Sequence, residues 1–358
     1  MERKLKDGTV LVNKWPNKKK SAFSMTFDDG FQAHYTHVRS ILNTYGFKGT
    51  FYINPKTINK RINNFEDTDE RYAYWDQLAK MAREGHEIAS HSFSHPHLNE
   101  MPIGDEKTRG TLLYELYESK RIIEEKIPNY NCINIAYPYG FHNSQLDEYI
   151  SKYYEAARSA GNTPNSSSPS EEEFLDLNSK LILWRKTREK PEDDLKKLKR
   201  FIRWIKKESI STEKWAILVA HEVLPFSKLS TTDSFEPTSN EWLIGLCEWL
   251  KNASERDEIW VDTVANVTKY IKERDYFDYA IKTKSMNELK ITIKTTFDPL
   301  IYNFPLTIEI IVPESWHSVE LSYNGQKEIK KPYRRDNQTY ITTNVIPHDR
   351  LLTLKQNK

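Results

Sequence analysis

Two clusters of side chains in this sequence could together hold a metal ion. Asp28 and Asp29 stand in one, and His91 and His95 stand well downstream in the other. Histidines at i and i+4 can face one way from a helical turn, and with one carboxylate they supply the three protein ligands typical of catalytic zinc. The spare carboxylate could accept a proton from water in the fourth position. Asp29 suits the ligand role and Asp28 the base.

Each cluster also has an ordinary structural explanation, because Asp-Asp-Gly is a common turn and single histidines are often packed. The flanking residues favour a shared site. The run 21–27 is short, apolar and β-prone, and the run 85–90 resembles it and ends just before His91. Catalytic carboxylates in α/β barrels commonly follow the carboxyl ends of strands. Both clusters are therefore expected on one face of a sheet.

Two further segments complete a family pattern. Ala136-Tyr-Pro-Tyr-Gly140 and Ile217-Leu-Val-Ala-His221 follow the first two clusters in order. With them, residues 21–275 resemble the polysaccharide deacetylase family, the NodB-homology carbohydrate esterases. The resemblance implies an α/β fold, a distorted (β/α) barrel, and a metal-dependent hydrolase that removes acetyl groups from glycans.

The resemblance also implies a role for each motif residue. The metal ligands would be Asp29, His91 and His95. Asp28 would be the general base and His221 the general acid, while the backbone N–H of Tyr139 would stabilise the oxyanion. Pro138 would fix the backbone of the substrate-binding wall and Gly140 would permit a close approach.

One position departs from the family pattern. Ala136 stands where the family often has an arginine that orients the catalytic aspartate, and a methyl group cannot replace it. Arg158 and Arg185 are the candidates to compensate; the alternative is that each is a surface arginine. Trp184 is the nearest match to the family's fourth motif. Pro138, Tyr139, Trp184 and Arg158 form the expected substrate-binding set.

Other ring-bearing residues receive weaker interpretations. His86 is expected to pack beneath the site and His97 to pack within its loop, although His97 could also line the cleft. His34 has no partner in a ligand motif. Tyr74 and Trp75 could stack on a sugar ring or simply be buried against the barrel.

Composition limits the class of protein. The 358 residues include 53 Lys and Arg against 51 Asp and Glu, a net charge of +2, so nothing indicates a nucleic-acid partner. No apolar run approaches the roughly twenty residues of a membrane span. The first residues lack the apolar core of a secretion signal, so an extracellular or envelope location is expected if a signal was removed and a cytoplasmic one otherwise. Cys132 and Cys247 are expected to be buried thiols.

Alternating strand-like and helical runs predict the barrel over residues 21–280, after an N-terminal extension of residues 1–20. The remaining strands are expected at 49–53, 133–137, 215–219 and 259–261, and the helices at 75–84, 105–126, 192–208 and 240–252. Residues 161–170 are expected to be a surface loop.

Residues 283–358 predict a small all-β, sandwich-like domain, because runs near 289, 306, 319 and 339 alternate apolar and polar residues. Asn324-Gly325 is a hairpin signal. Trp316 and Tyr323 could bind glycan, but a stabilising appendage is the preferred interpretation.

The sequence therefore predicts a hydrolase acting on an N-acetylated glycan or oligosaccharide, with an acetylated carbohydrate as its only expected partner. Zinc is the expected metal, and cobalt or manganese would suit the same ligands. The alternatives are an O-acetyl polysaccharide esterase and a catalytically idle glycan-binding protein on the same fold. The sugar, its linkage and the oligomeric state are left open.

Overall fold

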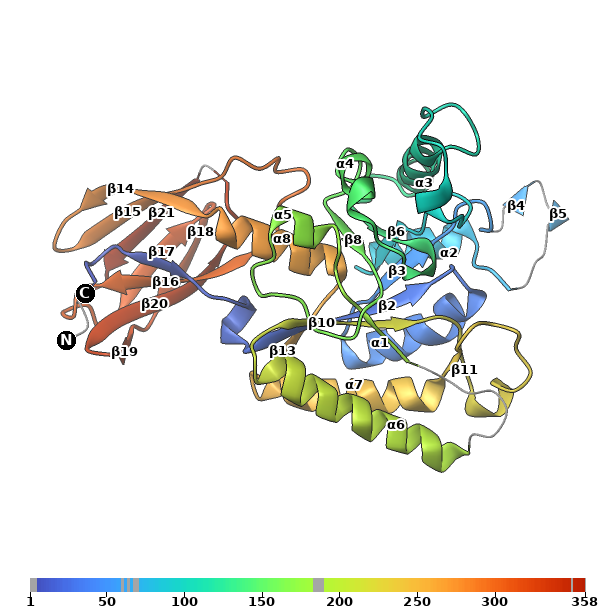
Figure 1. The fold of residues 1–358 in the computed structure, drawn as a ribbon. Helices are drawn as coiled ribbons and strands as arrows, with labels where there is room; N and C mark the ends of the chain where they lie inside the picture. Colours follow the sequence, from blue (N-terminus) through green and yellow to red (C-terminus); the bar gives the residue numbers. More distant parts are fainter. Residues whose placement is uncertain are drawn as a thin grey trace. The chain divides into compact units, whose positions relative to one another are not determined.

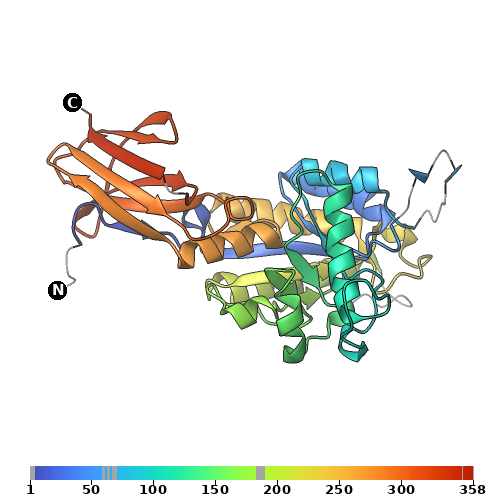
Figure 2. The ribbon, with the colours of Figure 1, turned by 90° about the horizontal axis from the view of Figure 1, so that it is seen from above.

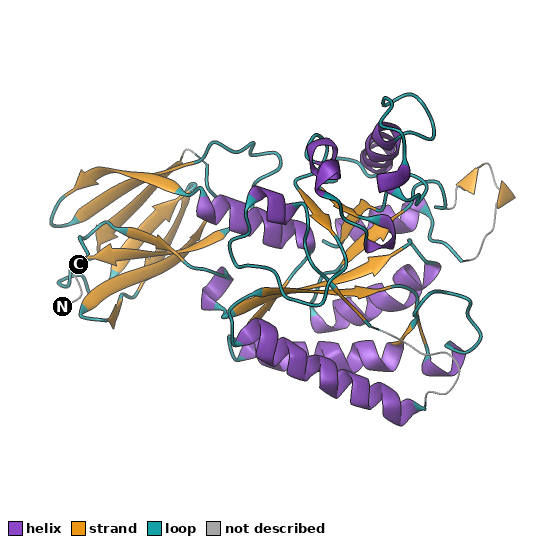
Figure 3. Cartoon of the chain, in the orientation of Figure 1, coloured by secondary structure: helices purple, strands orange, loops and turns teal. Residues whose placement is uncertain are grey.

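The computed structural model describes residues 5–58, 61–62, 65–66, 71–182, 190–348 and 350–357. The chain divides into two compact units. Residues 20–268 form one, called here the barrel unit, and residues 1–19 with 269–358 form the other, called the β unit. Helices and strands alternate in the barrel unit, whereas the β unit consists mostly of strands (Figures 1 and 3).

A parallel sheet forms the centre of the barrel unit. Its strands are β2 (Ser21–Asp28), β3 (Thr50–Ile53), β6 (Glu87–Ser90), β7 (Asn134–Ala136), β8 (Ala156–Arg158), β9 (Lys180–Leu181), β10 (Trp215–Ala220) and β13 (Ile259–Val261). They pair in the order β8-β7-β6-β3-β2-β10-β9, and β13 also pairs with β2. Among the described residues this path stays open between β8 and β9, so the sheet is a half barrel of the expected α/β class.

Strand β2 lies in the middle of this sheet, and all eight of its residues are buried. It pairs with β10 over residues 22–27, with β3 over residues 26–28 and with β13 over residues 21–23. A parallel strand covered on both faces requires apolar residues at nearly every position. The charged Asp28 is therefore an exception that needs a partner.

Helices follow most of these strands. The described α-helices of the barrel unit are α1 (Arg39–Tyr45), α2 (Trp75–Arg83), α3 (Leu112–Lys126), α4 (Asp147–Ile150), α5 (Glu171–Phe174), α6 (Pro191–Trp204) and α7 (Asn240–Glu255). Helix α8 (Val264–Asp275) begins in the barrel unit and ends in the β unit. Helix α6 continues as the π-helix η6 (Ile205–Ile210). None of the described helices combines the length and apolarity needed to span a membrane.

Helix α3, the long teal helix of Figure 2, begins later than the expected residue 105. Asp105 accepts hydrogen bonds from the backbone N–H groups of Lys107 and Thr108, and Gly110 has a φ of 81°. This local turn competes with a helix and delays its start to Leu112. Residues 161–170 contain no helix or extended strand, as expected of a loop.

The β unit contains two antiparallel sheets. One is ordered β1-β16-β20-β19 and the other β14-β15-β21-β17-β18. Their bounds are β1 (Val10–Val12), β14 (Asp278–Lys284), β15 (Glu288–Lys294), β16 (Leu306–Val312), β17 (Val319–Tyr323), β18 (Gln326–Lys330), β19 (Tyr333–Arg335), β20 (Gln338–Val345) and β21 (Arg350–Gln356). The hairpin signal is confirmed, because Asn324 and Gly325 both have positive φ between β17 and β18.

The expected domain boundaries differ from the structure at both ends. Residues 1–20 were expected as a separate extension, but Val10 to Val12 pair with Ile308 to Ile310, so this segment supplies an edge strand of the β unit. Residues 278–280, expected in the barrel, open strand β14. A three-residue strand has too little periodicity to identify, and its partner strand lies far along the chain, with Val10 opposite Ile310.

Trp316 is a core residue of the β unit. Its side chain is 1% exposed, and its Nε1 donates to the carbonyl of Met286 at 2.8 Å. The hydroxyl of Tyr323 donates to the carbonyl of Ile346. These contacts support the stabilising interpretation of both aromatic residues and leave Trp316 inaccessible to a glycan.

Glu273 on α8 is a buried carboxylate within the β unit. Its Oε2 accepts a hydrogen bond from the backbone N–H of Phe304 at 3.1 Å, while its Oε1 is buried without a hydrogen-bond partner among the described atoms. Burial raises the pKa of Glu273 to about 8. The folded protein therefore holds a proton that the unfolded chain releases near pH 4.5.

We expect Glu273→Gln to stabilise the protein at alkaline pH. A carboxyl group whose pKa is raised on folding stabilises the fold fully below its unfolded pKa, and that stability is lost as pH rises to the folded pKa of about 8. Glutamine can still accept from Phe304 but cannot ionise. At pH 9 the variant should gain roughly 1–3 kcal/mol in the free energy of unfolding, with almost no gain at pH 4.

Thermal unfolding of both proteins across this pH range measures the difference. The exposed Glu100→Gln, which loses the same charge, is the control and should shift the melting temperature by little at any pH. A gain for Glu273→Gln that was equal at pH 4 and pH 9 would contradict the proposed ionisation.

Candidate metal centre

The candidate residues meet at the carboxyl edge of the parallel sheet. Asp28 is the last residue of β2, His91 follows β6, Arg158 ends β8 and His221 follows β10. Parallel strands end at the same edge, so side chains that are far apart in sequence converge there. The expectation that the two motifs share one face is confirmed by their contacts.

Asp29, His91 and His95 form a cluster that could hold a cation. Their ligand atoms all lie within 4.8 Å of one another. Asp29 Oδ1 is 3.8 Å from Nε2 of His91 and 3.8 Å from Nε2 of His95. These separations are too long for hydrogen bonds, and they suit three donors arranged around a shared ion. One carboxylate with two imidazoles is also a donor set typical of zinc.

His91 is held in the orientation that a ligand needs. Its Nδ1 lies 2.9 Å from the carbonyl oxygen of Ala136, so Nδ1–H donates and Nε2 is left facing the cluster. Burial lowers the pKa of His91 to about 3, and burial also lowers that of His95. Both rings are therefore neutral near pH 7, which is the form that binds metal.

The two histidines do not share a helical turn, so that expectation is wrong. Residues 91–95 form an irregular loop in which Ser92 and His95 have φ of 62°. Positive φ is unfavourable for both side chains, and such strain persists only where neighbouring contacts hold it. One such contact is the hydroxyl of Ser92, which accepts a hydrogen bond from the backbone N–H of His95 at 3.0 Å.

Glu115 is a supporting residue that the sequence analysis missed. Its two carboxylate oxygens accept from the backbone N–H and the hydroxyl of Ser94, each at 2.7 Å. Glu115 is 2% exposed, and it lies on α3 among the buried Leu112 and Leu116. A glutamate at a buried helical position was the available signal, because buried carboxylates are rare unless they have partners.

Asp28 and Arg158 form a buried ion pair. Arg158 Nη2 lies 2.5 Å from Asp28 Oδ2, and each residue is 3% exposed. Burial is the largest single cause and raises the pKa of Asp28, but the positive charge of Arg158, its hydrogen bond to Asp28 and the nearby His91 and His221 together outweigh burial, and the pKa falls below its ordinary value. Asp28 Oδ1 is buried with no hydrogen-bond partner among the described atoms. One carboxylate oxygen is thus anchored and the other is unpaired.

Asp29 has the opposite electrostatic environment to Asp28. Burial is the largest cause that raises the pKa of Asp29, to about 6, and the negative charge of Asp28 raises it further. Two adjacent carboxylates with pKa values displaced in opposite directions suit different chemical roles. A cation beside Asp29 would displace its proton and keep it ionised.

The neighbouring strands explain how Arg158 reaches Asp28. Arg158 on β8 is the register partner of Ala136 on β7, the position where the arginine was expected. The guanidinium lies 5.0 Å from the ring centroid of Tyr52, and its Nη1 donates to the hydroxyl of Ser179 at 3.4 Å. Arg158 is therefore an ion-pair partner of the aspartate in the interior, not a surface arginine. Arg185 and Trp184 lie outside the described residues.

His221 is fixed through its backbone. The ring of His34 donates through Nε2 to the carbonyl of His221 at 3.0 Å. His34 is fully buried on the π-helix η2 (His34–Val38), and burial lowers its pKa to about 4, so this ring is neutral. The Nδ1 atom of His221 is buried with no described hydrogen-bond partner, and the ring lies edge-on to Phe235 at 5.3 Å. His34 was not predicted to contribute.

The loop 138–140 lies beside the histidines. Tyr139 has a φ of 61° and is 55% exposed, and its ring stacks on His97 at 4.0 Å and meets His95 edge-on at 4.6 Å. Pro138 is buried, and a Cβ on Gly140 would lie 2.4 Å from that of Ala160. His97 thus packs in its loop against Tyr139. His86 packs in the interior, where its Nδ1 accepts from the backbone N–H of Gly49 at 3.2 Å.

Comparison with known proteins identifies relatives of the region that carries this site. Residues 16–156 match the family model of polysaccharide deacetylase. The peptidoglycan-N-acetylmuramic acid deacetylase PdaC of Bacillus subtilis is 29% identical over 132 residues, which cover 37% of this chain and 24% of that protein. A gellan lyase of a Bacillus species is 22% identical over 355 residues, covering 95% of this chain and 13% of that protein.

The solved structure of Bacillus subtilis PdaC aligns with a TM-score of 0.42 at 19% identity, and the alignment covers 73% of this chain and 95% of that one. The chain spans less than half of the length of the curated relatives that it matches. The region that matches the polysaccharide deacetylase family model, residues 16–156, holds Asp28, Asp29, His91 and His95, which bears out the resemblance of this region to that family.

Proposed function

We propose that this chain is a metal-dependent hydrolase that removes acetyl groups from an N-acetylated glycan or oligosaccharide. The observation that carries the proposal is the cluster of Asp29, His91 and His95 next to the anchored carboxylate of Asp28. The match of residues 16–156 to the polysaccharide deacetylase family model supports deacetylation, and similar proteins are named as deacetylases of peptidoglycan and chitin. The sugar of this chain's substrate is not fixed by those names.

Asp29, His91 and His95 would hold the divalent cation. Zinc is proposed because one carboxylate and two neutral imidazoles suit it, and cobalt or manganese would suit the same ligands. When bound, the cation would lower the pKa of water and polarise the acetyl carbonyl.

Asp28 is proposed as the general base. Its pKa is held below the ordinary value, so it is ionised at neutral pH, and its Oδ1 has no described partner and can accept a proton. Arg158 holds Oδ2 and so keeps the carboxylate in one orientation. In this proposal Arg158 acts on the base as a positioning residue, and the earlier assignment of Arg158 to substrate binding gives way to it.

His221 is proposed as the general acid that returns a proton to the leaving amine. Its backbone is fixed by His34, and its ring flanks the two aspartates closely enough to influence both of their pKa values. The backbone N–H of Tyr139 is proposed to stabilise the oxyanion, and Pro138 to shape the wall of the cleft. Together these residues cover proton removal, charge stabilisation and proton return.

The contact of Arg158 with Asp28 also bears on the idle-barrel alternative. That alternative rested on Ala136, which stands where the family often has an arginine. Because a neighbouring strand supplies a guanidinium to the same aspartate, Ala136 no longer favours an inactive barrel.

A panel of N-acetylated and O-acetylated oligosaccharides tests the proposed activity. The protein is incubated with each substrate after chelation and again after addition of zinc, cobalt or manganese, and product masses are followed. Metal-dependent loss of acetyl groups from the N-acetylated set is expected. Loss only from the O-acetylated set would identify the esterase alternative, and no loss from either set would contradict the proposal.

Removing a histidine ligand should abolish tight metal binding. We expect His91→Ala and His95→Ala each to weaken zinc binding by about 100-fold or more, because two protein ligands make a poor site. Zinc content after dialysis measures the effect. His97→Ala is the matched control, since His97 lies beside the site but is not in the cluster, and this variant should keep its metal. Full occupancy in both ligand variants would refute the assignment.

The two aspartates should separate binding from turnover. Asp28→Asn should retain zinc yet lose roughly 10²–10⁴-fold in kcat, because the amide cannot accept a proton. Asp29→Asn should lose both zinc and activity. Parallel measurement of metal content and kcat decides the roles. Loss of metal from Asp28→Asn with retention in Asp29→Asn would show that the roles are reversed.

Arg158 should control the pH at which the base ionises. Its positive charge lowers the pKa of Asp28, so Arg158→Gln should raise that pKa, and any acidic limb set by Asp28 should move to higher pH. We expect kcat at neutral pH to fall by roughly 10²–10³-fold, with part of the loss recovered at alkaline pH.

Moving the arginine tests its position. The double variant Arg158→Ala with Ala136→Arg moves the arginine to position 136 on β7, which is the register partner of position 158. This variant should recover part of the kcat that Arg158→Gln loses. The exposed Arg203→Gln is the control for loss of one positive charge. An unshifted pH profile in a folded Arg158→Gln protein would mean that Arg158 does not act on the base.

A further inference from the structure

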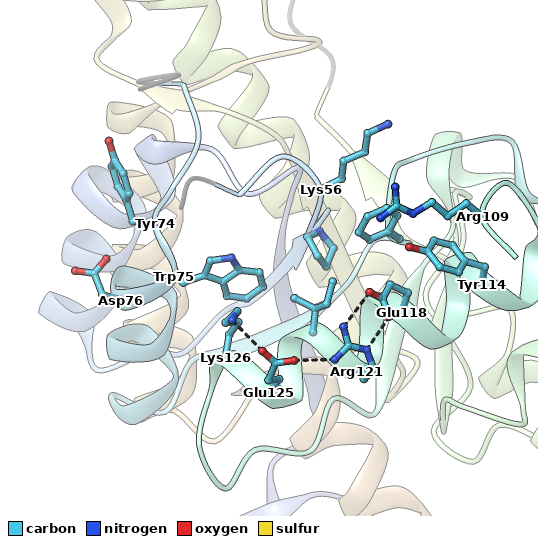
Figure 4. A pocket seen from close by; sticks show the side chains of 13 residues that line it. Lys56, Tyr74, Trp75, Asp76, Arg109, Tyr114, Glu118, Arg121, Glu125 and Lys126 are labelled. Carbon is cyan, nitrogen blue, oxygen red and sulfur yellow. Dashed lines mark hydrogen bonds and ion pairs between the residues drawn. The ribbon is translucent and has the colours of Figure 1, made fainter. Parts of the chain in front are cut away.

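A groove on the barrel unit lies outside the metal cluster. It encloses about 730 Å³ and is lined by residues from the start of α2, from one face of α3 and from the segment after β3 (Figure 4). This volume is in the range of small-ligand sites, which run from roughly 300 to 1,000 Å³. None of Asp28, Asp29, His91, His95 and His221 lines it.

Phe93 connects the groove to the metal loop. It lines the groove and lies between the two histidine ligands in sequence, and its carbonyl accepts from the backbone N–H of Lys56 at 3.1 Å. The Phe93 ring meets Tyr114 edge-on at 5.5 Å. A ligand in the groove would therefore contact, through Phe93, the same loop that carries the proposed metal ligands His91 and His95.

Aromatic side chains supply the apolar surface of the groove. Trp75 extends toward its middle, and Phe93 and Tyr114 also line it. The face of a pyranose ring carries C–H groups that pack well on flat aromatic surfaces, while its hydroxyls need polar partners. Aromatic and charged side chains in one groove therefore suit a sugar better than a purely apolar ligand.

The charged side chains that line the groove are paired with one another on one side only. Along α3, Arg121 forms ion pairs with Glu118 and Glu125, each at 2.7 Å, and Lys126 pairs with Glu125 at 2.9 Å. This row is internally neutralised and lies along one edge in Figure 4. Both carboxylates that α3 contributes are thus already occupied by cations.

Lys56 and Arg109 lie together on the other side of the groove, and both are exposed. Within the described part of the chain, neither of them has a salt bridge to a carboxylate. Asp76, the remaining acidic residue of the lining, turns away from them in Figure 4. The two cations therefore give that side of the groove a positive potential without a protein counter-charge.

We propose that this groove binds an acidic sugar unit, a hexuronate of the glycan chain, with its ring on the aromatic residues and its carboxylate at Lys56 and Arg109. The identification of the ligand as carbohydrate rests on the proposed function. The groove would act as an accessory site that favours anionic polysaccharides, because it is separate from the residues that would perform hydrolysis.

Binding is measured calorimetrically on the full chain, with an oligoglucuronate tetrasaccharide and a neutral glucose tetrasaccharide as probes. The protein is treated with chelator so that no metal can bind the carboxylate. The acidic probe should bind more tightly than the neutral one, and added salt should weaken its binding. Failure of hydrolysis in the acetylated panel would leave this result unaffected, so the two proposals fail independently.

The double variant Lys56→Gln with Arg109→Gln should weaken binding of the acidic probe by about tenfold and leave the neutral probe unchanged. The control, Lys80→Gln with Arg83→Gln, removes the same charge from exposed positions of α2 outside the groove lining. It should bind the acidic probe as the unmodified chain does.

Three outcomes would overturn the proposal. Equal affinity for the neutral and acidic probes would show that the carboxylate is not recognised. Equal weakening by both double variants would show a general effect of net charge. Full competition by inorganic sulfate at matched ionic strength would show that the two cations bind any anion and that the aromatic residues contribute nothing.

Discussion

Asp28 can stay ionised inside the fold because Arg158 contacts it, and the candidate site depends on this pair. Removing either partner would leave a buried charge without compensation, which typically costs about 3–5 kcal/mol. The pair also connects the central strand β2 to β8, the last strand on one side of the sheet. Strands β3, β6 and β7 lie between these two strands. A single side chain thus fixes both the protonation and the direction of the carboxylate.

The histidine loop is stabilised in a different way. Its positive-φ residues are unfavourable by themselves, and the hydrogen bonds that Ser92 accepts from His95 and Glu115 accepts from Ser94 hold the loop in place. Burial keeps the His91 ring neutral, and the carbonyl of Ala136 selects the tautomer that leaves Nε2 facing the cluster. The loop conformation and burial thus leave two neutral imidazoles beside Asp29, the arrangement that the proposed cation would require.

Helix α3 serves two parts of the barrel unit. Glu115 on its buried side supports the loop of residues 91–95, while its ion-paired row from Glu118 to Lys126 forms an edge of the groove. Phe93 lies at the point where these two parts meet. Residues 91–95 therefore contribute both to the cluster, through His91 and His95, and to the lining of the groove, through Phe93.

The sequence by itself determined the motif residues and most of the elements that carry them. Apolar runs before Asp28 and His91 predicted strands, and parallel strands bring their carboxyl ends together, so the meeting of the two motifs followed from local patterns. The residue types then indicated the chemistry. The alanine at position 136 also indicated that a cation had to come from elsewhere, and Arg158 was one of two candidates.

The tertiary structure alone decided the contacts that depend on register and on distant pairing. Arg158 reaches Asp28 because it is the register partner of Ala136, and register is not encoded in the spacing of residues within one strand. The roles of Glu115 and His34 depend on contacts across the fold, and the edge strand Val10–Val12 pairs with residues at the far end of the chain. Local periodicity carries no information about such partners, so only the folded chain reveals them.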